Sequence, residues 1–232
     1  TARQFIAHGI NVIGNGHSQA KLDALRQELG PNFFGVAGDA SEENVQDRLF
    51  SSAQEQFGQP ASIVVVNAGR GLGGSVKDAD LSRFEAVLNI NLKGALSLMQ
   101  KAARQMVDIH PAGFPNHASD IIILGSVVGR SVSPFSAIYG ATKFAIHSLA
   151  ESLRREIGPR GVRVSLIEPG IVLSGFQEGA SYSKEMINRF EQDFGPLLKG
   201  QDIAQAIHFI VSQPAHIHVS DIVVRPTRQD YP

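Results

Sequence analysis

The sequence predicts an α/β fold: a single doubly wound, Rossmann-like parallel sheet with helices on both faces. Short apolar runs alternate with longer amphipathic stretches along the 232 residues. The runs are continuously apolar, as is typical of strands buried on both faces. A strand that returns to its sheet through a helix makes a right-handed crossover to a parallel neighbour. Ligands of such a sheet bind at the carboxyl ends of its strands.

The first residues look like the end of a strand–helix unit whose strand is not in the sequence. Residues 1–8 (TARQFIAH) look like the second half of a helix that ends at Gly9, and no strand precedes them. A doubly wound fold places its first strand in the middle of the sheet. We therefore expect a gap between two halves of the sheet. We also expect roughly 20 further residues upstream, comprising a strand, its loop and a helical turn.

Two strands joined by a helix come next. An apolar run at 10–14 predicts the first strand, and FFGVA at 33–37 predicts the second. A helix is expected between them at 18–29, because leucines recur there on one helical face. Ser18 is a suitable N-cap for this helix and Gly30 a suitable stop.

The rest of the chain repeats this alternation. A helix is expected at 41–57, capped by Ser41 and closed by Gly58, and the β-branched run at 62–67 predicts a buried strand. The same criteria predict helices at 82–106, 136–157 and 201–212 and strands at 121–124, 162–167 and 221–224. We expect all of these elements to form one domain, 1–232.

Composition and charge exclude several classes of function. Hydrophobic residues make up 43% of the chain and charged residues 19%, as in folded globular domains. The net charge of −1 argues against a nucleic-acid or anionic-membrane surface. No apolar run is long enough to span a bilayer and no signal-peptide pattern occurs, so we expect a cytoplasmic protein. The chain has no cysteine, and nothing completes a metal site with the two histidines of 108–119, so we expect no metal.

A glycine-rich segment at 69–74 matches the G-x-G-x-x-G dinucleotide fingerprint and follows a predicted strand. In a true fingerprint the glycines open a helix whose first amides meet the pyrophosphate. Here the loop-like residues 75–82 (SVKDADLS) separate the glycines from the next helix. We therefore interpret 69–74 as a flexible loop, and regard Asn67-Ala68-Gly69 at the strand end as the informative part.

Tyr139 and Lys143 carry the candidate chemistry. They are four residues apart on one predicted helix and so share a face. A nearby ammonium favours the phenolate and lowers a tyrosine pKa from about 10, which lets the phenol exchange a proton while a hydride moves. Ser126 follows the strand 121–124 and either hydrogen-bonds a substrate oxygen or caps a turn. Asn91 is unfavourable inside a helix, which predicts a polar partner or a kink.

Together these residues resemble the short-chain dehydrogenase/reductase family, from Thr1 to about residue 226. Six motifs in the family's order and spacing are far more specific than any one of them. The segment from about Pro214 resembles the branch acting on 3-hydroxy acids and related small alcohols. The motifs read D-A-S at 39–41, N-A-G at 67–69, N-L-K-G at 91–94, Ser126, Y-x-x-x-K at 139–143 and P-G-I-V-L-S at 169–174.

The resemblance implies a nicotinamide-dependent enzyme acting on a small alcohol or carbonyl, and it implies a role for each catalytic residue. Tyr139 would be the general acid/base. Lys143 would lower the pKa of Tyr139 and hold the nicotinamide ribose. Ser126 would orient the substrate oxygen, and Asn91 would anchor a water that relays protons past Lys143.

The resemblance also implies cofactor contacts and an assembly. Helices 82–106 and 136–157 would form the interfaces of a homotetramer or homodimer. The family's phosphate loop, T-G-x-x-x-G-x-G, belongs to the segment expected upstream of Thr1. The implied contacts are Asp39 and Ala40 at the adenine, the Asn67, Ala68 and Gly69 backbone along the cofactor, Tyr139 and Lys143 at the nicotinamide ribose, and Pro169, Gly170 and Val172 at the carboxamide, with Ser174 where the family usually has Thr.

The choice of nicotinamide depends on the loop after the second strand of the family's fold. NAD users usually carry an acid there to bind the ribose hydroxyls, but 15–18 (NGHS) contains none. His17 stands where NADP-using members often carry Arg. We therefore favour NADP, with NAD as the alternative in which His17 is a plain surface residue.

Two alternatives to an oxidoreductase remain open. A non-catalytic homologue would bind nucleotide as a sensor or scaffold, but the retained Ser126, Tyr139 and Lys143 argue against it. A related lyase would use the Ser–Tyr pair without nicotinamide, but such relatives tend to replace the lysine with Arg. Whatever the substrate, 174–199 is expected to form a lid over it, with aromatic side chains that line the site or pack the lid on the body.

Overall fold

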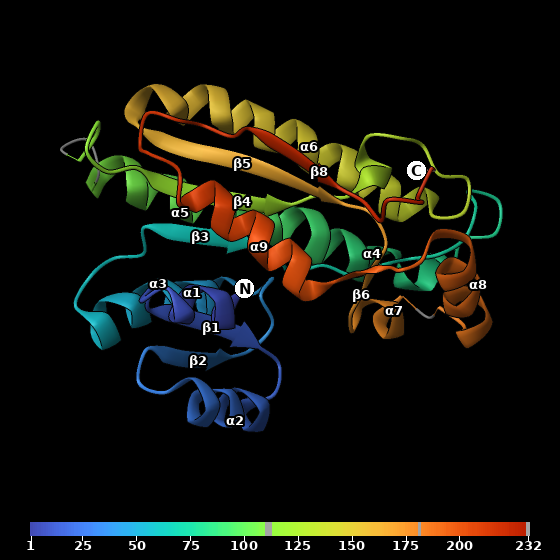
Figure 1. Cartoon of the computed structure of the whole chain (residues 1–232), viewed down its shortest axis with the longest axis horizontal. Helices are drawn as coiled ribbons and strands as arrows, with labels where there is room; N and C mark the ends of the chain where they lie inside the picture. The colour runs from blue at the N-terminus through green and yellow to red at the C-terminus, as the bar shows by residue number, and fades with distance from the viewer. Residues whose placement is uncertain (110–112, 181, 231–232) are drawn as a thin grey trace.

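A computed structural model of the chain describes residues 1–109, 113–180 and 182–230 (Figure 1). Each strand of the described part pairs in parallel with its neighbours, which confirms the predicted fold class. The strands are β1 (Val12–Gly16), β2 (Phe33–Ala37), β3 (Ile63–Val66), β4 (Ser119–Leu124), β5 (Val162–Pro169), β6 (Val172–Leu173), β7 (Leu198–Lys199) and β8 (Asp221–Val224). The α-helices are α1 (Ala2–Ala7), α2 (Gln19–Leu29), α3 (Glu43–Phe57), α4 (Phe84–Leu88), α5 (Ala95–Ile109), α6 (Ala137–Ile157), α7 (Phe176–Gly179), α8 (Lys184–Phe194) and α9 (Gly200–Val211).

The main sheet is divided as the sequence predicted. One part pairs β1 with β2, in a register that sets Val12 opposite Phe33. The other has the order β3-β4-β5-β8, with Ile121 opposite Val164. Within the described residues no hydrogen-bonded pairing joins β1 to β3, where the expected central strand would lie.

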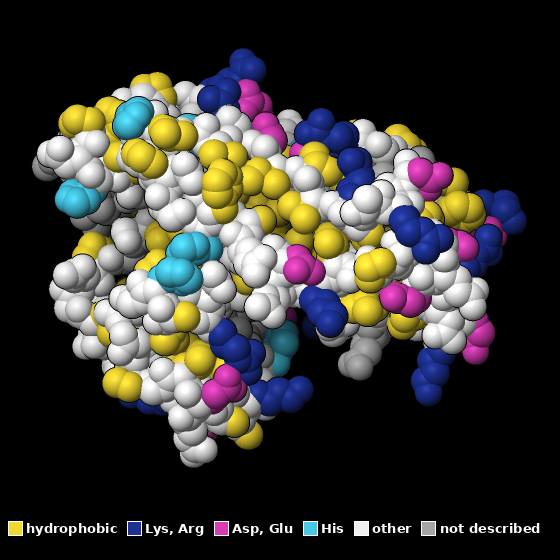
Figure 2. Space-filling model, viewed as in Figure 1, with side chains coloured by type: hydrophobic (Ala, Val, Ile, Leu, Met, Phe, Trp, Pro, Cys, Tyr) yellow, Lys and Arg dark blue, Asp and Glu magenta, His cyan; other side chains and the backbone are white. Residues whose placement is uncertain are grey.

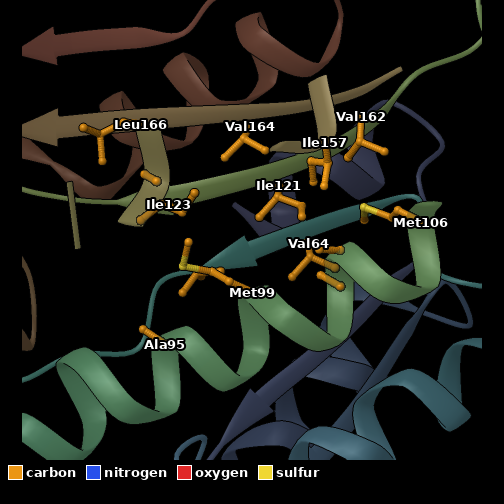
Figure 3. Packing of buried hydrophobic residues seen from close by; sticks show 14 of the residues in the cluster. Val64, Ala95, Met99, Met106, Ile121, Ile123, Ile157, Val162, Val164 and Leu166 are labelled. Atoms are coloured by element: carbon orange, nitrogen blue, oxygen red, sulfur yellow. The ribbon is translucent and has the colours of Figure 1, made fainter. Parts of the chain in front are cut away.

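Alternate residues of the central strands face two separate cores. On β4, Ile121 and Ile123 pack with the side chains of α5 and α6, and Figure 3 shows Met99 and Met106 against this face. Ile122 and Leu124 point the other way, into a cluster with α1 and α9. A strand buried on both faces has no solvent side, which explains why these runs are uniformly apolar. Both helical layers thereby fix the carboxyl ends of β4 and β5.

Several predicted boundaries need correction, among them the strand expected at 10–14, which is Val12–Gly16, and three near the candidate site. Ser41 does not cap α3, which begins at Glu43, because the Ser41 amide and hydroxyl both bond the Asp39 carboxylate. The helix expected at 82–106 is interrupted by a π-helical turn, Asn89–Gly94. Pro169 ends β5 instead of following it, since a proline at the last position removes only one donor from the ladder.

The surface is mixed in charge on the face that Figure 2 shows, where basic and acidic side chains lie among apolar ones. Among the described helices none is long and apolar enough to cross a membrane.

Candidate functional site

Ser126 lies directly beyond the carboxyl end of β4. Its hydroxyl accepts a hydrogen bond from the Val128 amide at 3.4 Å and so caps the short turn Val127–Gly129. The same hydroxyl hydrogen-bonds the phenol of Tyr139 on α6. The interpretation of Ser126 as a turn cap is therefore confirmed, and its contact with the candidate acid/base leaves the hydrogen bond to a substrate oxygen as a prediction.

Lys143 lies one helical turn after Tyr139, and its side chain is buried. Its Nζ donates a hydrogen bond to the Leu124 carbonyl oxygen at 2.7 Å and lies 5.6 Å from the centroid of the Tyr139 ring. Burial lowers the pKa of Lys143 to about 8. The predicted shared face is confirmed, and it points to the end of β4 where Ser126 lies.

The predicted effect of Lys143 on Tyr139 is wrong for this arrangement. The phenol is enclosed, and burial raises the pKa of Tyr139 above its usual value instead of lowering it. The hydrogen bond with Ser126 opposes this rise, and the neighbouring Tyr182 adds to it. The physical reason is that desolvation of the enclosed phenol is the largest cause of the shift, while the ammonium of Lys143 is directed at the Leu124 carbonyl. At neutral pH Tyr139 is therefore a protonated phenol.

Asn91 has the polar partners that its place in a helix predicted. Its Oδ1 accepts the Arg70 amide at 2.7 Å, and its Nδ2 donates to the Arg70 carbonyl at 2.8 Å and to Thr142 Oγ1 at 3.1 Å. The Thr142 hydroxyl in turn donates to the Tyr139 carbonyl. Asn91 thus ties the loop after β3 to the helix that carries Tyr139.

The predicted adenine contacts lie where β2 ends. Asp39 accepts hydrogen bonds from the amide and hydroxyl of Ser41, each at 2.8 Å, and these lower its pKa. The charges of His17 and Arg70 lower the pKa of Asp39 further, which places both side chains near this carboxylate. His17 itself is exposed, while Asp39 and Ala40 are half-buried.

The remaining predicted contacts lie in two loops. Asn67, Ala68 and Gly69 are exposed after β3, and 69–74 contains no helix, as expected. The turn after Pro169 is held by a bond from the Gly170 amide to the Val224 carbonyl at 2.7 Å. The last two predicted residues have structural contacts as well. Val172 of β6 pairs with Leu198 of β7, and the Ser174 hydroxyl accepts a hydrogen bond from the Phe176 amide at the start of α7.

Sequence reasoning missed two residues, the half-buried His147 and the buried Gln229. His147 lies on α6 one turn beyond Lys143, and its Nε2 accepts the Ser126 amide at 3.2 Å. Gln229 is 6% exposed, and its Oε1 accepts a hydrogen bond from the Ile171 amide, in the turn after Pro169, at 2.9 Å. The position of His147 four residues after Lys143 could have signalled it. Gln229 is too far along the chain for any local signal.

The expected lid contains α7 and α8. An aromatic row runs along it from the site: the ring centroids of Tyr139 and Phe176 are 5.4 Å apart, those of Phe176 and Tyr182 6.4 Å, and those of Tyr182 and Phe190 6.1 Å. Of the aromatic side chains offered as lining or packing groups, Phe176 contacts Tyr139 of α6, and Tyr182 and Phe190 continue the row within the segment. Of the two histidines considered for a metal, His110 lies outside the described residues.

Residues 1–185 match the family model described as short chain dehydrogenase. The chain belongs to this family. Among the short-chain dehydrogenase's relatives, an uncharacterized oxidoreductase of Staphylococcus epidermidis is 28% identical over 225 residues, covering 97% of this chain and 90% of the relative. One of Staphylococcus aureus is 29% identical over 219 residues, covering 94% and 87%.

Solved structures agree with this short-chain dehydrogenase over almost its whole length. The closed form of a serine dehydrogenase complexed with NADP+ has a TM-score of 0.84 and 27% identity, covering 99% of this chain and 90% of that one. A 3-ketoacyl-(acyl-carrier-protein) reductase from Brucella melitensis complexed with NADH has a TM-score of 0.86 and 25% identity, covering 98% and 91%. The predicted family and fold are thereby confirmed, and the chain is an oxidoreductase of this family.

Proposed function

We propose that this oxidoreductase transfers a hydride between NADP(H), in preference to NAD(H), and a small alcohol or carbonyl compound of the hydroxy-acid type. The observation that carries the proposal is the meeting of Ser126, Tyr139 and Lys143 at the carboxyl end of β4. The substrate class is supported by the similarity to serine dehydrogenase, of which two solved structures resemble this chain at 27% identity.

The residues present suit a dinucleotide at its two ends. Asp39 offers a carboxylate that stays ionised, and the exposed backbone of 67–69 can approach the cofactor closely. A side chain at Gly69 would press on Asn91, with its Cβ 3.2 Å from Asn91 Oδ1, so glycine lets this loop pack against Asn91. The Lys143 ammonium donates one hydrogen bond to the Leu124 carbonyl oxygen. An ammonium has three N–H donors, so two remain for the ribose hydroxyls. NADP(H), when bound, supplies or accepts the hydride.

In the reductive direction the chain's own residues handle the proton. Tyr139, kept protonated by its raised pKa, donates a proton from its phenol to the substrate carbonyl oxygen. The Ser126 hydroxyl donates a hydrogen bond to the same oxygen and holds it against the phenol. Lys143 stabilises the phenolate that results through its positive charge. Asn91 keeps the helix and the loop at Arg70 in register.

We further propose that 174–199 acts as the lid. At one end of this segment the ring of Phe176 lies tilted against that of Tyr139. At the other end Phe190 and Phe194 continue the aromatic row along α8, with ring centroids 6.3 Å apart. Closing these rings over the site would exclude water from the proton transfer.

A spectrophotometric assay tests the cofactor and substrate class. With serine and other small 3-hydroxy acids we expect reduction of NADP+ with a kcat/KM about tenfold above that with NAD+. Replacing His17 with Asp should reverse this order, because a carboxylate repels the 2′-phosphate and accepts the ribose hydroxyls. Nicotinamide absorbance measures both rates, with Lys21→Ala as a matched surface control. Lack of turnover with every hydroxy acid, alcohol and carbonyl and both cofactors would refute the proposed function.

The pH dependence follows from Lys143. Its pKa of about 8 means that the ammonium is lost as pH rises through that value, long before the phenol ionises. We expect kcat/KM for carbonyl reduction to fall about tenfold per pH unit above about pH 8. The profile of Lys143→Met, which is slow throughout, should lack this limb. An unsubstituted enzyme that keeps its rate up to pH 10 would contradict the assignment.

A further inference from the structure

An imidazole lies directly behind the catalytic serine, outside the set of residues that the mechanism uses. His147 comes from α6, and its side chain is only 13% exposed. Its Nε2 is 3.2 Å from the Ser126 amide nitrogen and accepts that hydrogen bond. Because an acceptor nitrogen carries no proton, the ring proton of the neutral imidazole must be on Nδ1.

Two glycines shape the space that this ring occupies. A Cβ at Gly125 would come within 2.2 Å of His147 Nε2, and one at Gly129 would come within 2.5 Å of its Cε1. These residues flank Ser126 and its turn on both sides. Any side chain there would expel the imidazole from its contact with the serine backbone, so the ring and the turn fit together as one unit.

A carboxylate stands on the far side of the ring. Glu168 on β5 is fully buried, and its Oε2 is 3.8 Å from His147 Nδ1. Arg130, at the end of the serine turn, binds both oxygens of this carboxylate, with its Nε 2.8 Å from Oε2. Arg130 therefore neutralises the buried charge, while Oε2 attracts the Nδ1 proton and fixes the ring's tautomer.

We propose that His147 is a positioning residue: its neutral imidazole holds the Ser126 backbone so that the serine hydroxyl meets Tyr139 and the substrate oxygen. Glu168 and Arg130 orient this imidazole in its Nδ1–H form. This inference rests on the proposed oxidoreductase function. The pKa supports it: burial lowers that of His147 to about 4, Lys143 and Arg130 lower it too, and Glu168 opposes them. A protonated ring could not accept the Ser126 amide, so the neutral form is the competent one.

Two substitutions separate the hydrogen bond that His147 accepts from the volume that its side chain fills. His147→Phe fills the same space but cannot accept a hydrogen bond, and we expect kcat to fall about 10- to 100-fold, as for a catalytic group displaced by a fraction of an ångström. KM, the cofactor Kd and Tm should stay near those of the unsubstituted enzyme. His147→Gln restores an acceptor oxygen and should recover at least half of the lost kcat. The matched control is His208→Phe, on the opposite face of the sheet from the site.

Nitrogen-15 NMR of the imidazole gives a second readout that needs no turnover. We expect an Nδ1–H tautomer that does not titrate above pH 5. A ring titrating near its ordinary value, an Nε2–H tautomer, or a fully active His147→Phe variant would each overturn the proposal while leaving the oxidoreductase function intact. If the unsubstituted enzyme has no turnover, the proposed function fails and the positioning role of His147 fails with it.

Discussion

Replacing Tyr139 with Phe should lower kcat by about 10³-fold or more, while the cofactor Kd changes less than about twofold. The phenol is the proposed proton donor, and its raised pKa keeps it protonated at neutral pH. Phenylalanine preserves the ring, and with it the contact to Phe176 at 5.4 Å, so the lid should pack as before. Steady-state kinetics with the best hydroxy acid, together with fluorescence titration of NADPH, measures both quantities.

The matched control is Tyr182→Phe. Tyr182 belongs to the same aromatic row and also loses only a hydroxyl, one that raises the pKa of Tyr139 without being the proposed proton donor. Its kcat should stay within about threefold of the unsubstituted enzyme, because the phenol that donates the proton is retained. A near-normal kcat for Tyr139→Phe, or an equally large loss of kcat in Tyr182→Phe, would show that Tyr139 is not the proton donor.

The sequence predicted the parts of the site that depend on period and order. Continuous apolar runs identify strands with two buried faces, and the predicted limits of 33–37 and 221–224 match β2 and β8. A spacing of four residues on a helix places Tyr139 and Lys143 on one face whatever surrounds them. Asn91 was identifiable because an amide side chain within a helix needs a partner, and it found one in Arg70.

Properties set by distant contacts were beyond the sequence. The direction of the pKa shift of Tyr139 depends on how deeply the phenol is buried and on the Leu124 carbonyl that holds Lys143. The helical spacing places His147 on the face of Lys143, but its contact with the Ser126 turn depends on Gly125, 22 residues earlier, which leaves space for the ring. Local patterns report which side chains share an element, whereas burial and electrostatics depend on how elements pack together.

The largest effect on stability is expected from Arg163→Met, at the opposite end of β5 from the candidate catalytic groups. Arg163 and Asp120 are both buried, and the guanidinium bonds both carboxylate oxygens at 2.8 Å. The same guanidinium donates to four backbone carbonyls of the connection between α9 and β8. These carbonyls belong to Val211, Gln213, Pro214 and Ile217.

Removing Arg163 leaves the Asp120 charge buried without its partner, which should cost about 3–5 kcal/mol of unfolding free energy. Urea unfolding followed by circular dichroism measures this loss.

The pH dependence of the loss identifies its cause. Burial already raises the pKa of Asp120 and Arg163 opposes that rise, so without Arg163 the folded state holds the carboxyl proton more tightly than the unfolded state. The variant should therefore regain stability as pH falls from 7 toward the ordinary carboxyl pKa of 3.8, because protonation removes the buried charge. The double variant Arg163→Met/Asp120→Leu should recover at least half of the loss at pH 7. A loss that is equally large in the double variant and independent of pH would show that the four carbonyl bonds, not the ion pair, account for it.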